Sequence, residues 1–165
     1  MGKELSLALK PIGRIVHGAA QPDGPRPRPS ALGEKTARIE IDAAWAGALD
    51  GIEEFSHIWV LWWLDQSPAG SELDSLQVRP EGRAEMPLRG IFATRSPRRP
   101  NPIAMTPVRL LARQGARLTV QGLDAFEGTP ILDLKPYIRR GDLIPEATMP
   151  DWLEELWRIH DEERS

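Results

Sequence analysis

The sequence predicts a mostly β fold: a single antiparallel β-barrel or curled sheet with few helices. Short apolar runs rich in Val, Ile, Thr and Trp recur along the chain, and such runs are typical of strands. Turn-forming Gly, Pro and Asp residues separate these runs, without the regular helical crossovers that a parallel sheet requires. With 165 residues, the chain is most simply one domain, residues 1–165, and is long enough to bury a core.

The start of the chain is predicted to enter the sheet. Leu5, Leu7 and Leu9 alternate like strand residues, and residues 10–16 (KPIGRIV) follow them as a first strand. Within that strand, Gly13 marks a bulge or a close approach of two backbones.

A long loop and a second strand come next. Residues 19–36 are rich in Pro and Gly, so we expect a long, mobile loop. Residues 36–42 (TARIEID) alternate between apolar and polar side chains, which indicates a half-buried strand. Residues 43–51 favour a short helical turn that ends near Asp50 and Gly51.

Residues 55–67 (FSHIWVLWWLDQS) form the most hydrophobic segment, and their Trp, Val and Ile content favours a strand. Both faces of this strand are largely apolar, so one should face the core and the other a helix or a second subunit. We interpret His57 as a core histidine on this strand, whose side chain should point away from that of its neighbour Ser56.

The remaining elements are predicted as short strands and one helix. The sequence predicts short strands over residues 76–80 and 90–94. It predicts a hairpin over residues 107–123, with its turn at Gln114 and Gly115. Residues 123–138 should end the sheet, and a helix should cover about residues 150–163. The apolar stripe of that helix consists of Trp152, Leu153, Leu156, Trp157 and Ile159.

Composition narrows the classes of function. The chain has no cysteine and its three histidines lie far apart, so we expect neither a disulfide scaffold nor a metal site. No apolar run has the length of a membrane span and no signal peptide is visible, which makes a cytoplasmic protein the expectation. The net charge is −3, but arginines concentrate between Arg83 and Arg113, and a polyanion responds to such local fields.

The segment GIFATRSPRRPNPIAMTP, residues 90–107, is the most distinctive stretch of the chain. Its prolines fix the backbone and exclude a helix, so a stiff loop should hold Arg95, Arg98 and Arg99 in set directions. Such a loop between two core strands suits an anionic or π-rich ligand. The alternative is a surface turn whose arginines are merely solvated.

Several familiar catalytic signatures are missing from the sequence. No GxGxxG follows a first strand, there is no Walker loop, and no Ser/His/Asp arrangement stands out. The acidic residues Asp124, Glu127 and Asp133 are candidate acid–base groups, although turn carboxylates also serve simply to accept hydrogen bonds from backbone amides.

Three segments, in order, resemble the TsaA-like domain of the TrmO family of S-adenosylmethionine-dependent tRNA methyltransferases. They are FSHIWVLWWL (55–64), GIFATRSPRRPNPI (90–103) and GLDAFEGTPILDLKPYI (122–138). The resemblance runs from about Pro11 to Tyr137. It implies a β-barrel homodimer that methylates N6 of threonylcarbamoyladenosine beside the tRNA anticodon.

The same resemblance implies roles for individual residues. The S-adenosylmethionine site would be lined by Asp65, Gln66, Arg95, Met105, Leu123, Asp124, Ala125, Phe126 and Glu127. Asp124 or Asp133 would be the base, with nothing in the sequence to select between them. Arg98 and Arg99 are candidate contacts with RNA, or alternatively with a second subunit. Lys135 and Tyr137 are candidate contacts with an RNA phosphate, or alternatively groups that carry a proton.

Two other functions remain open at this point. One is a non-catalytic RNA-binding module with the same barrel. The other is a methyltransferase for a different acceptor, because longer family members continue into a second domain whereas this sequence stops after one predicted helix.

Overall fold

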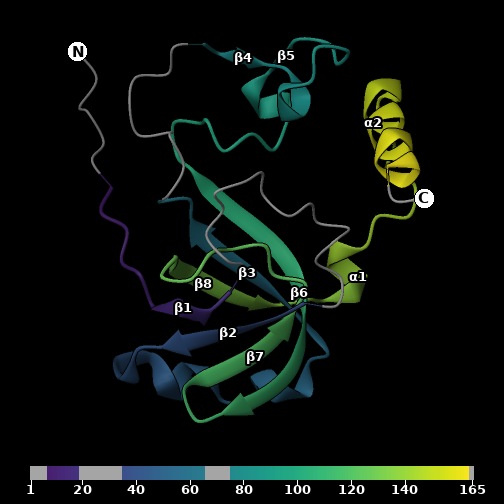
Figure 1. The fold of residues 1–165 in the computed structure, drawn as a ribbon. Coiled ribbons are helices and arrows are strands. Elements are labelled where there is room, and N and C mark those ends of the chain that lie inside the picture. Colours follow the sequence, from purple (N-terminus) through teal and green to yellow (C-terminus); the bar gives the residue numbers. More distant parts are fainter. Residues whose placement is uncertain (1–6, 19–34, 66–74, 164–165) are drawn as a thin grey trace, which may run out of the picture. The chain divides into compact units, whose positions relative to one another are not determined.

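The computed structural model in Figure 1 describes residues 7–18, 35–65 and 75–163. It divides into two compact units. We call the part up to residue 66 together with residues 103–137 the barrel unit. Residues 67–102 together with residues 138–165 are the second unit. The predicted loop over residues 19–36 lies almost wholly outside the described residues, as does Gln66.

Within the described residues, six strands close into an antiparallel barrel, which confirms the predicted fold class. The strands follow the order β1-β2-β7-β6-β3-β8 around the barrel, and β8 pairs with both β1 and β3 to close it. Their bounds are β1 Gly13–His17, β2 Thr36–Ile41, β3 His57–Trp63, β6 Ile103–Gln114, β7 Arg117–Gln121 and β8 Pro130–Pro136.

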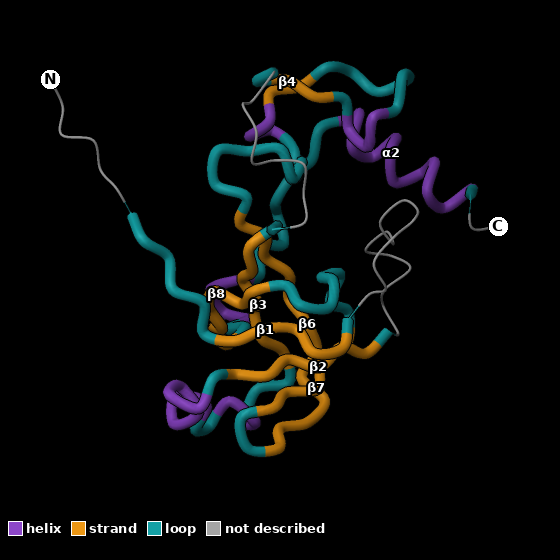
Figure 2. Tube along the Cα trace, turned by 60° about the vertical axis from the view of Figure 1, so that its left-hand side comes forward, coloured by secondary structure: helices purple, strands orange, loops and turns teal. Residues whose placement is uncertain are grey.

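Alternating apolar side chains fill the barrel. In β2, Ala37, Ile39 and Ile41 are buried while the residues between them are half-buried or exposed. The same alternation runs along β3, as expected for a strand with one face in the core. Figure 2 traces the backbone of the six barrel strands from a second direction. The fully buried members of the core include Ile15, Ile39, Ile58, Val60, Leu118, Val120 and Ile131.

Gly13 fits a close approach between β1 and β2. A Cβ atom added at this position would lie 2.2 Å from the backbone oxygen of Glu40, so only glycine is accommodated there. The preceding residues differ from the prediction: Leu7 and Leu9 lie outside any strand and are exposed. Alternation alone misled there because neither leucine has a neighbouring strand to pair with in the described chain.

The interpretation of His57 as a core histidine is wrong. Its ring is exposed at the start of β3, and its Nδ1 lies 2.9 Å from the Ser56 hydroxyl oxygen. Strand alternation sends Ile58 inwards and His57 outwards. Successive side chains point to opposite faces only within a strand. Ser56 lies before the first residue of β3, so its side chain and that of His57 need not point apart.

One end of the barrel is tied to two 3₁₀ helices, η2 (Ala43–Leu49) and η3 (Ile52–Glu54). Arg113 of β6 donates to the Leu49 carbonyl at 2.9 Å and pairs with Asp50 and Glu53. These carboxylates raise the pKa of Arg113, with the hydrogen bond to Glu53 as the largest cause. The predicted hairpin between β6 and β7 is confirmed, with Gly115 in the left-handed region at φ 62°.

The second unit contains short elements. They are β4 Gln77–Val78, η4 Pro80–Gly82, β5 Arg89–Gly90, η5 Ile91–Ala93, α1 Arg139–Asp142 and α2 Asp151–Glu162. The predicted strand over residues 90–94 is wrong: pairing ends at Gly90, and the apolar run Ile91–Ala93 forms a 3₁₀ turn. That run is too short for periodicity to separate a strand from a helical turn.

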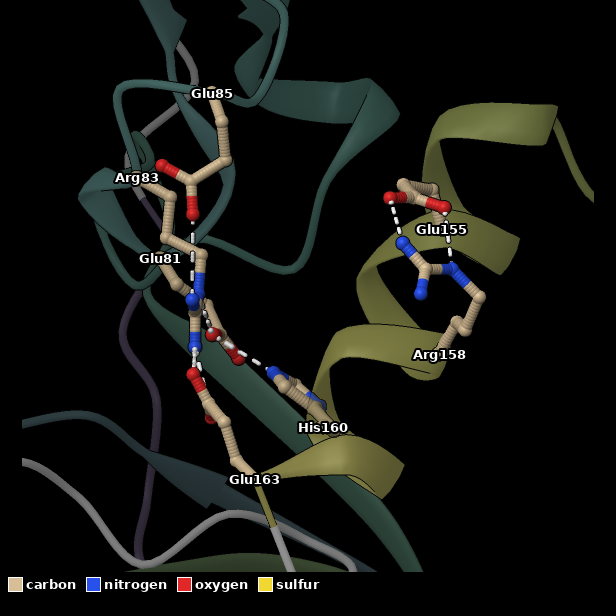
Figure 3. Close-up of polar contacts among 7 residues, drawn as sticks. All are labelled: Glu81, Arg83, Glu85, Glu155, Arg158, His160 and Glu163. Atoms are coloured by element: carbon tan, nitrogen blue, oxygen red, sulfur yellow. Dashed lines mark hydrogen bonds and ion pairs between the residues drawn. The ribbon is translucent and has the colours of Figure 1, made fainter.

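The C-terminal helix α2 agrees with the prediction and docks on the η4 segment of the same unit through polar contacts. His160 is 4% exposed and its Nε2 lies 2.9 Å from Glu81, while Arg83 pairs with Glu163 at 2.8 Å. Figure 3 shows these side chains converging, with Arg158 and Glu155 on another part of the helix. Leu156 is the buried apolar residue of the predicted stripe, whereas Trp157 remains 39% exposed.

Candidate functional site

The β7–β8 loop, residues 122–129, is fastened at both ends. Gly122 and Gly128 adopt φ values of 91° and 86°, a region that favours glycine. The Gly122 N–H donates to the Lys35 carbonyl at 3.0 Å, and the Gly128 N–H donates to the Ile15 carbonyl at 2.8 Å. Three predicted cofactor residues in this loop are buried: Leu123, Ala125 and Phe126. Their side chains therefore anchor the loop on both sides of Asp124.

Asp124 is the half-buried carboxylate of this loop. Its Oδ1 accepts a hydrogen bond from the Thr106 hydroxyl at 3.1 Å. Thr106 lies in β6 opposite Val60, whose side chain is fully buried. The Asp124 carboxylate is thus held against β6 from the barrel side of that strand. Glu127, the other acidic residue of the loop, is exposed.

Met105 lies on the opposite face of β6 from Thr106. It is 49% exposed and pairs in register with Leu61 of β3. Adjacent residues of a strand point to opposite faces. The Met105 side chain therefore points away from the face of β6 that holds Asp124.

Asp133 also pairs with Leu61, from the other side, so Met105 and Asp133 flank the same residue on the outer face. The ladder is irregular beside Asp133, because Leu61 pairs with Asp133 but Trp62 pairs with Ile131. The Asp133 carboxylate accepts a hydrogen bond from the Leu134 N–H at 2.9 Å and pairs with Lys135 at 2.7 Å. Both oxygens are thus engaged, and so is the ammonium group of Lys135.

The last two predicted residues of the barrel unit lie at strand ends. Asp65 is exposed, two residues beyond the end of β3. Tyr137 follows β8 and its half-buried ring contacts two aromatic side chains of β3, Trp59 at a centroid distance of 5.7 Å and His57 at 6.4 Å.

We call residues 94–102, which carry Arg95, Arg98 and Arg99, the arginine loop; it belongs to the second unit. The structure gives its three arginines different environments. The Arg99 guanidinium donates to the carbonyls of Ser96, Ile91 and Thr94 at 3.2, 3.3 and 3.2 Å. Arg95 and Arg98 are exposed, and neither side chain has a hydrogen bond or ion pair within the described chain. Arg99 therefore holds the loop together, and the other two arginines project from it.

Sequence reasoning assigned the shaping of this loop to prolines alone and missed the hydroxyl groups. Thr94 Oγ1 donates to the Ile91 carbonyl at 2.9 Å, and the N–H groups of Ser96 and Arg98 donate to the hydroxyls of Thr94 and Ser96. The spacing of Thr94, Ser96 and Arg98 carries the signal, because a Ser or Thr hydroxyl commonly binds the amide two residues later.

Two kinds of feature are absent from the residues that the structure describes. No group of three or more His, Asp or Glu side chains there could hold a metal ion. None of the helices described is long and apolar enough to cross a membrane.

Comparisons with known proteins give consistent results. The model of the tRNA-methyltransferase O N-terminal domain matches residues 16–143. The chain is 37% identical to a probable S-adenosyl-L-methionine-binding protein of Methanothermobacter thermautotrophicus, over 81% of this chain and 92% of that protein. It is 35% identical to a putative S-adenosylmethionine-dependent methyltransferase, RcsF, of Pseudomonas aeruginosa, over 87% of this chain and 62% of that protein.

Solved structures agree. A crystal structure of TrmO superposes with a TM-score of 0.72 at 30% identity, covering 89% of this chain and 64% of that one. TrmO from Pseudomonas aeruginosa gives a TM-score of 0.68 at 28% identity, covering 87% and 62%. The chain thus spans a little under two thirds of these TrmO chains. Because the family model covers most of its length, the chain belongs to the tRNA-methyltransferase O N-terminal domain family.

Proposed function

We propose that this protein is an S-adenosylmethionine-dependent methyltransferase that acts on tRNA, at N6 of threonylcarbamoyladenosine beside the anticodon. The observation that carries the proposal is the family match over residues 16–143. The relatives named for S-adenosylmethionine binding support the choice of cofactor. With tRNA as the substrate, the protein would act in the cytoplasm.

The β7–β8 loop has chemistry that fits this cofactor. A sulfonium cation favours carboxylate and carbonyl oxygens, and Asp124 supplies a half-buried carboxylate held by Thr106. A partly buried site strengthens such an attraction, because water screens it less there than at an open surface. The anchored backbone on either side of Asp124 offers carbonyl oxygens, whereas Met105 lies on the opposite face of β6 from this group. When bound, S-adenosylmethionine supplies an electrophilic methyl group.

Asp124 is the better candidate for the base. A base must be able to accept a proton from the acceptor nitrogen. Within the described chain, Asp124 accepts one side-chain hydrogen bond, from Thr106, on one carboxylate oxygen. Asp133 instead carries an ion pair with Lys135 and a backbone hydrogen bond. Both oxygens of Asp133 are therefore already engaged within the protein.

The arginine loop would contribute cationic groups. The exposed Arg95 suits the carboxylate of the cofactor or a phosphate of RNA, and the exposed Arg98 suits RNA. Arg99 is the least suited of the three to contact RNA, because its guanidinium already serves three carbonyls. Lys135 would first have to leave Asp133 to bind a phosphate.

We also propose a homodimer. The outer face of β3 and β6 is apolar at the end where Trp63 pairs with Ile103 and Leu61 with Met105. Ile103 and Met105 are 39% and 49% exposed there, and exposed apolar side chains that gather on one face mark an interaction surface. Light scattering should report a dimer, and Ile103→Glu should shift the mass towards the monomer.

Titration calorimetry with S-adenosylmethionine tests the cofactor assignment. We expect the unaltered protein to bind, Asp124→Asn to bind more weakly, and Asp42→Asn, a matched change at an exposed aspartate of the barrel unit, to bind normally. Methyl transfer to tRNA should fall about 10²- to 10⁴-fold in Asp124→Asn if this carboxylate is the base. Absence of binding by folded, unaltered protein would overturn the proposal, and binding without transfer to any RNA would favour a non-catalytic module.

A further inference from the structure

The barrel strands carry a net positive charge, whereas the whole chain carries a net negative charge. The complete sequence has 21 Lys and Arg residues against 24 Asp and Glu residues. The six barrel strands, by contrast, contain Arg14, Arg38, Arg109, Arg113, Arg117 and Lys135 but only two carboxylates, those of Glu40 and Asp133. The barrel wall is thus locally cationic on an acidic protein.

Most of these cations are already paired. Glu40 binds Arg117 at 3.0 Å and Arg14 at 3.8 Å. Arg113 is held by Asp50 and Glu53, and Lys135 is held by Asp133.

Two arginines of the wall differ from the others. Arg38 and Arg109 are exposed, and in the part of the chain that the structure describes neither has an ion pair or a side-chain hydrogen bond. Their guanidinium groups are therefore available to an external anion.

Strand register places the two arginines on the same outer wall. Arg38 of β2 lies opposite Thr119 of β7 and beside His17 of β1. Arg109 of β6 lies opposite Gln121 of β7 and beside His57 of β3. Two strand spacings and a two-residue offset separate their Cα atoms by roughly 11–12 Å. We call Arg38, Arg109, His17 and His57 the wall patch.

Aromatic rings adjoin one end of the wall patch. The exposed ring of His57 lies edge-on to that of Tyr137, which in turn contacts Trp59. Cationic groups that follow a nucleic acid backbone beside aromatic rings that stack on bases are the combination that single-stranded nucleic acids bind.

We propose that the wall patch is an RNA-binding surface, in which Arg38 and Arg109 contact phosphates and the His57 ring stacks on an unpaired base. The inference rests on the proposed function in that RNA is the expected substrate. It also moves the main phosphate contacts away from Arg99 and Lys135, whose charged groups are engaged within the protein.

The test compares two double variants that remove the same charge from the same wall. Arg38→Gln with Arg109→Gln removes the unpaired arginines, and Arg14→Gln with Arg117→Gln removes those paired with Glu40. Binding of labelled total tRNA is measured across a range of NaCl concentrations. Loss of two phosphate contacts should lower the slope of log K against log salt by about 1.4–1.8 in the first variant, with a much smaller change in the second.

Calorimetry with S-adenosylmethionine serves as the control for folding, and the cofactor affinity of both double variants should equal that of the unaltered protein. His57→Ala should weaken tRNA binding while His57→Phe, which keeps a ring, should retain it. An unchanged slope in the Arg38 and Arg109 variant would overturn the proposal. So would equal losses in both double variants, or the absence of salt-dependent RNA binding by the unaltered protein.

These outcomes separate the wall patch from the proposed activity. If the unaltered protein methylates tRNA but the Arg38 and Arg109 variant binds it normally, the wall patch is wrong and the activity stands. If tRNA binding depends on these arginines but no methyl group is transferred, the wall patch stands and the activity is wrong.

Discussion

The barrel unit and the second unit are held together by different interactions. The barrel encloses one continuous cluster of buried apolar side chains, with Ile39, Ile58 and Ile131 completely inaccessible to solvent. In the described part of the second unit, the buried apolar side chains are few, and polar networks around Arg83 and Arg99 connect its segments. Two predicted cofactor residues illustrate the difference: Asp124 is held by the barrel, and Arg95 belongs to the second unit.

This difference has a physical consequence for the site. Apolar burial is insensitive to pH and is strengthened by salts that are excluded from the surface, whereas exposed ion pairs weaken as salt screens them. We therefore expect the barrel and its β7–β8 loop to keep their geometry under conditions that loosen the second unit.

The largest expected effect comes from a cavity in the barrel. Ile39→Ala removes a side chain that is 0% exposed, and such changes cost about 2–5 kcal/mol of unfolding free energy. Ile144→Ala, at an isoleucine of the second unit that is 61% exposed, should change it by less than about 0.5 kcal/mol. Denaturant titration of both variants measures the contrast, and equal costs would show that the barrel core is not the main source of stability.

The next effect concerns the arginine loop. Arg99→Ala removes three hydrogen bonds to backbone carbonyls, which should lower the free energy of local opening by about 1–3 kcal/mol. Hydrogen exchange at the amides of Thr94, Ser96 and Arg98 reports the change. The neighbouring Arg98→Ala should leave these amides protected, so similar exchange in both variants would contradict the role of Arg99.

A smaller effect is expected where α2 docks. Arg83→Gln removes the partner of Glu163, Glu81 and Glu85, and exchange should quicken at the amides of Glu163 and Arg83. The matched change in α2, Arg158→Gln, removes pairs with Glu155 and Glu162 on side chains that are about half exposed, and such pairs contribute little. If the two variants behave alike, the Arg83 network does not hold the helix.

The smallest effect is a response to acid in the second unit. A hydrogen bond from its own backbone amide and then Arg83 lower the pKa of Glu85, and Arg158 lowers the pKa of Glu155. A lowered pKa means stability that is present above the ordinary carboxylate range and is lost as pH falls through the lowered folded value. Helicity measured by circular dichroism should therefore decline only below about pH 4.5, and loss between pH 6 and pH 7 would contradict the assignment.

The sequence predicted the barrel more fully than the second unit, and the reason is physical. Strand alternation in residues 36–42 and the hairpin around Gly115 are local patterns that pairing then reinforces. The exposure of His57 depends instead on where β3 begins, and the 3₁₀ turn at Ile91–Ala93 on where β5 ends. The spacing of apolar residues along the chain does not show where β3 begins or where β5 ends.

The sequence proposes members for the candidate site but does not distinguish their environments. Asp124 and Asp133 looked equivalent in the sequence, and only the contacts with Thr106 and Lys135 distinguish them. Arg99 looked like an RNA contact because its targets, three backbone carbonyls, leave no mark in the sequence.

The most direct test of the proposed function is nucleoside analysis of tRNA by mass spectrometry after incubation with this protein and S-adenosylmethionine. We predict that threonylcarbamoyladenosine gains one methyl group, at N6, and that tRNA lacking this modification gains none. Unmethylated threonylcarbamoyladenosine after reaction with folded, cofactor-binding protein would contradict the account.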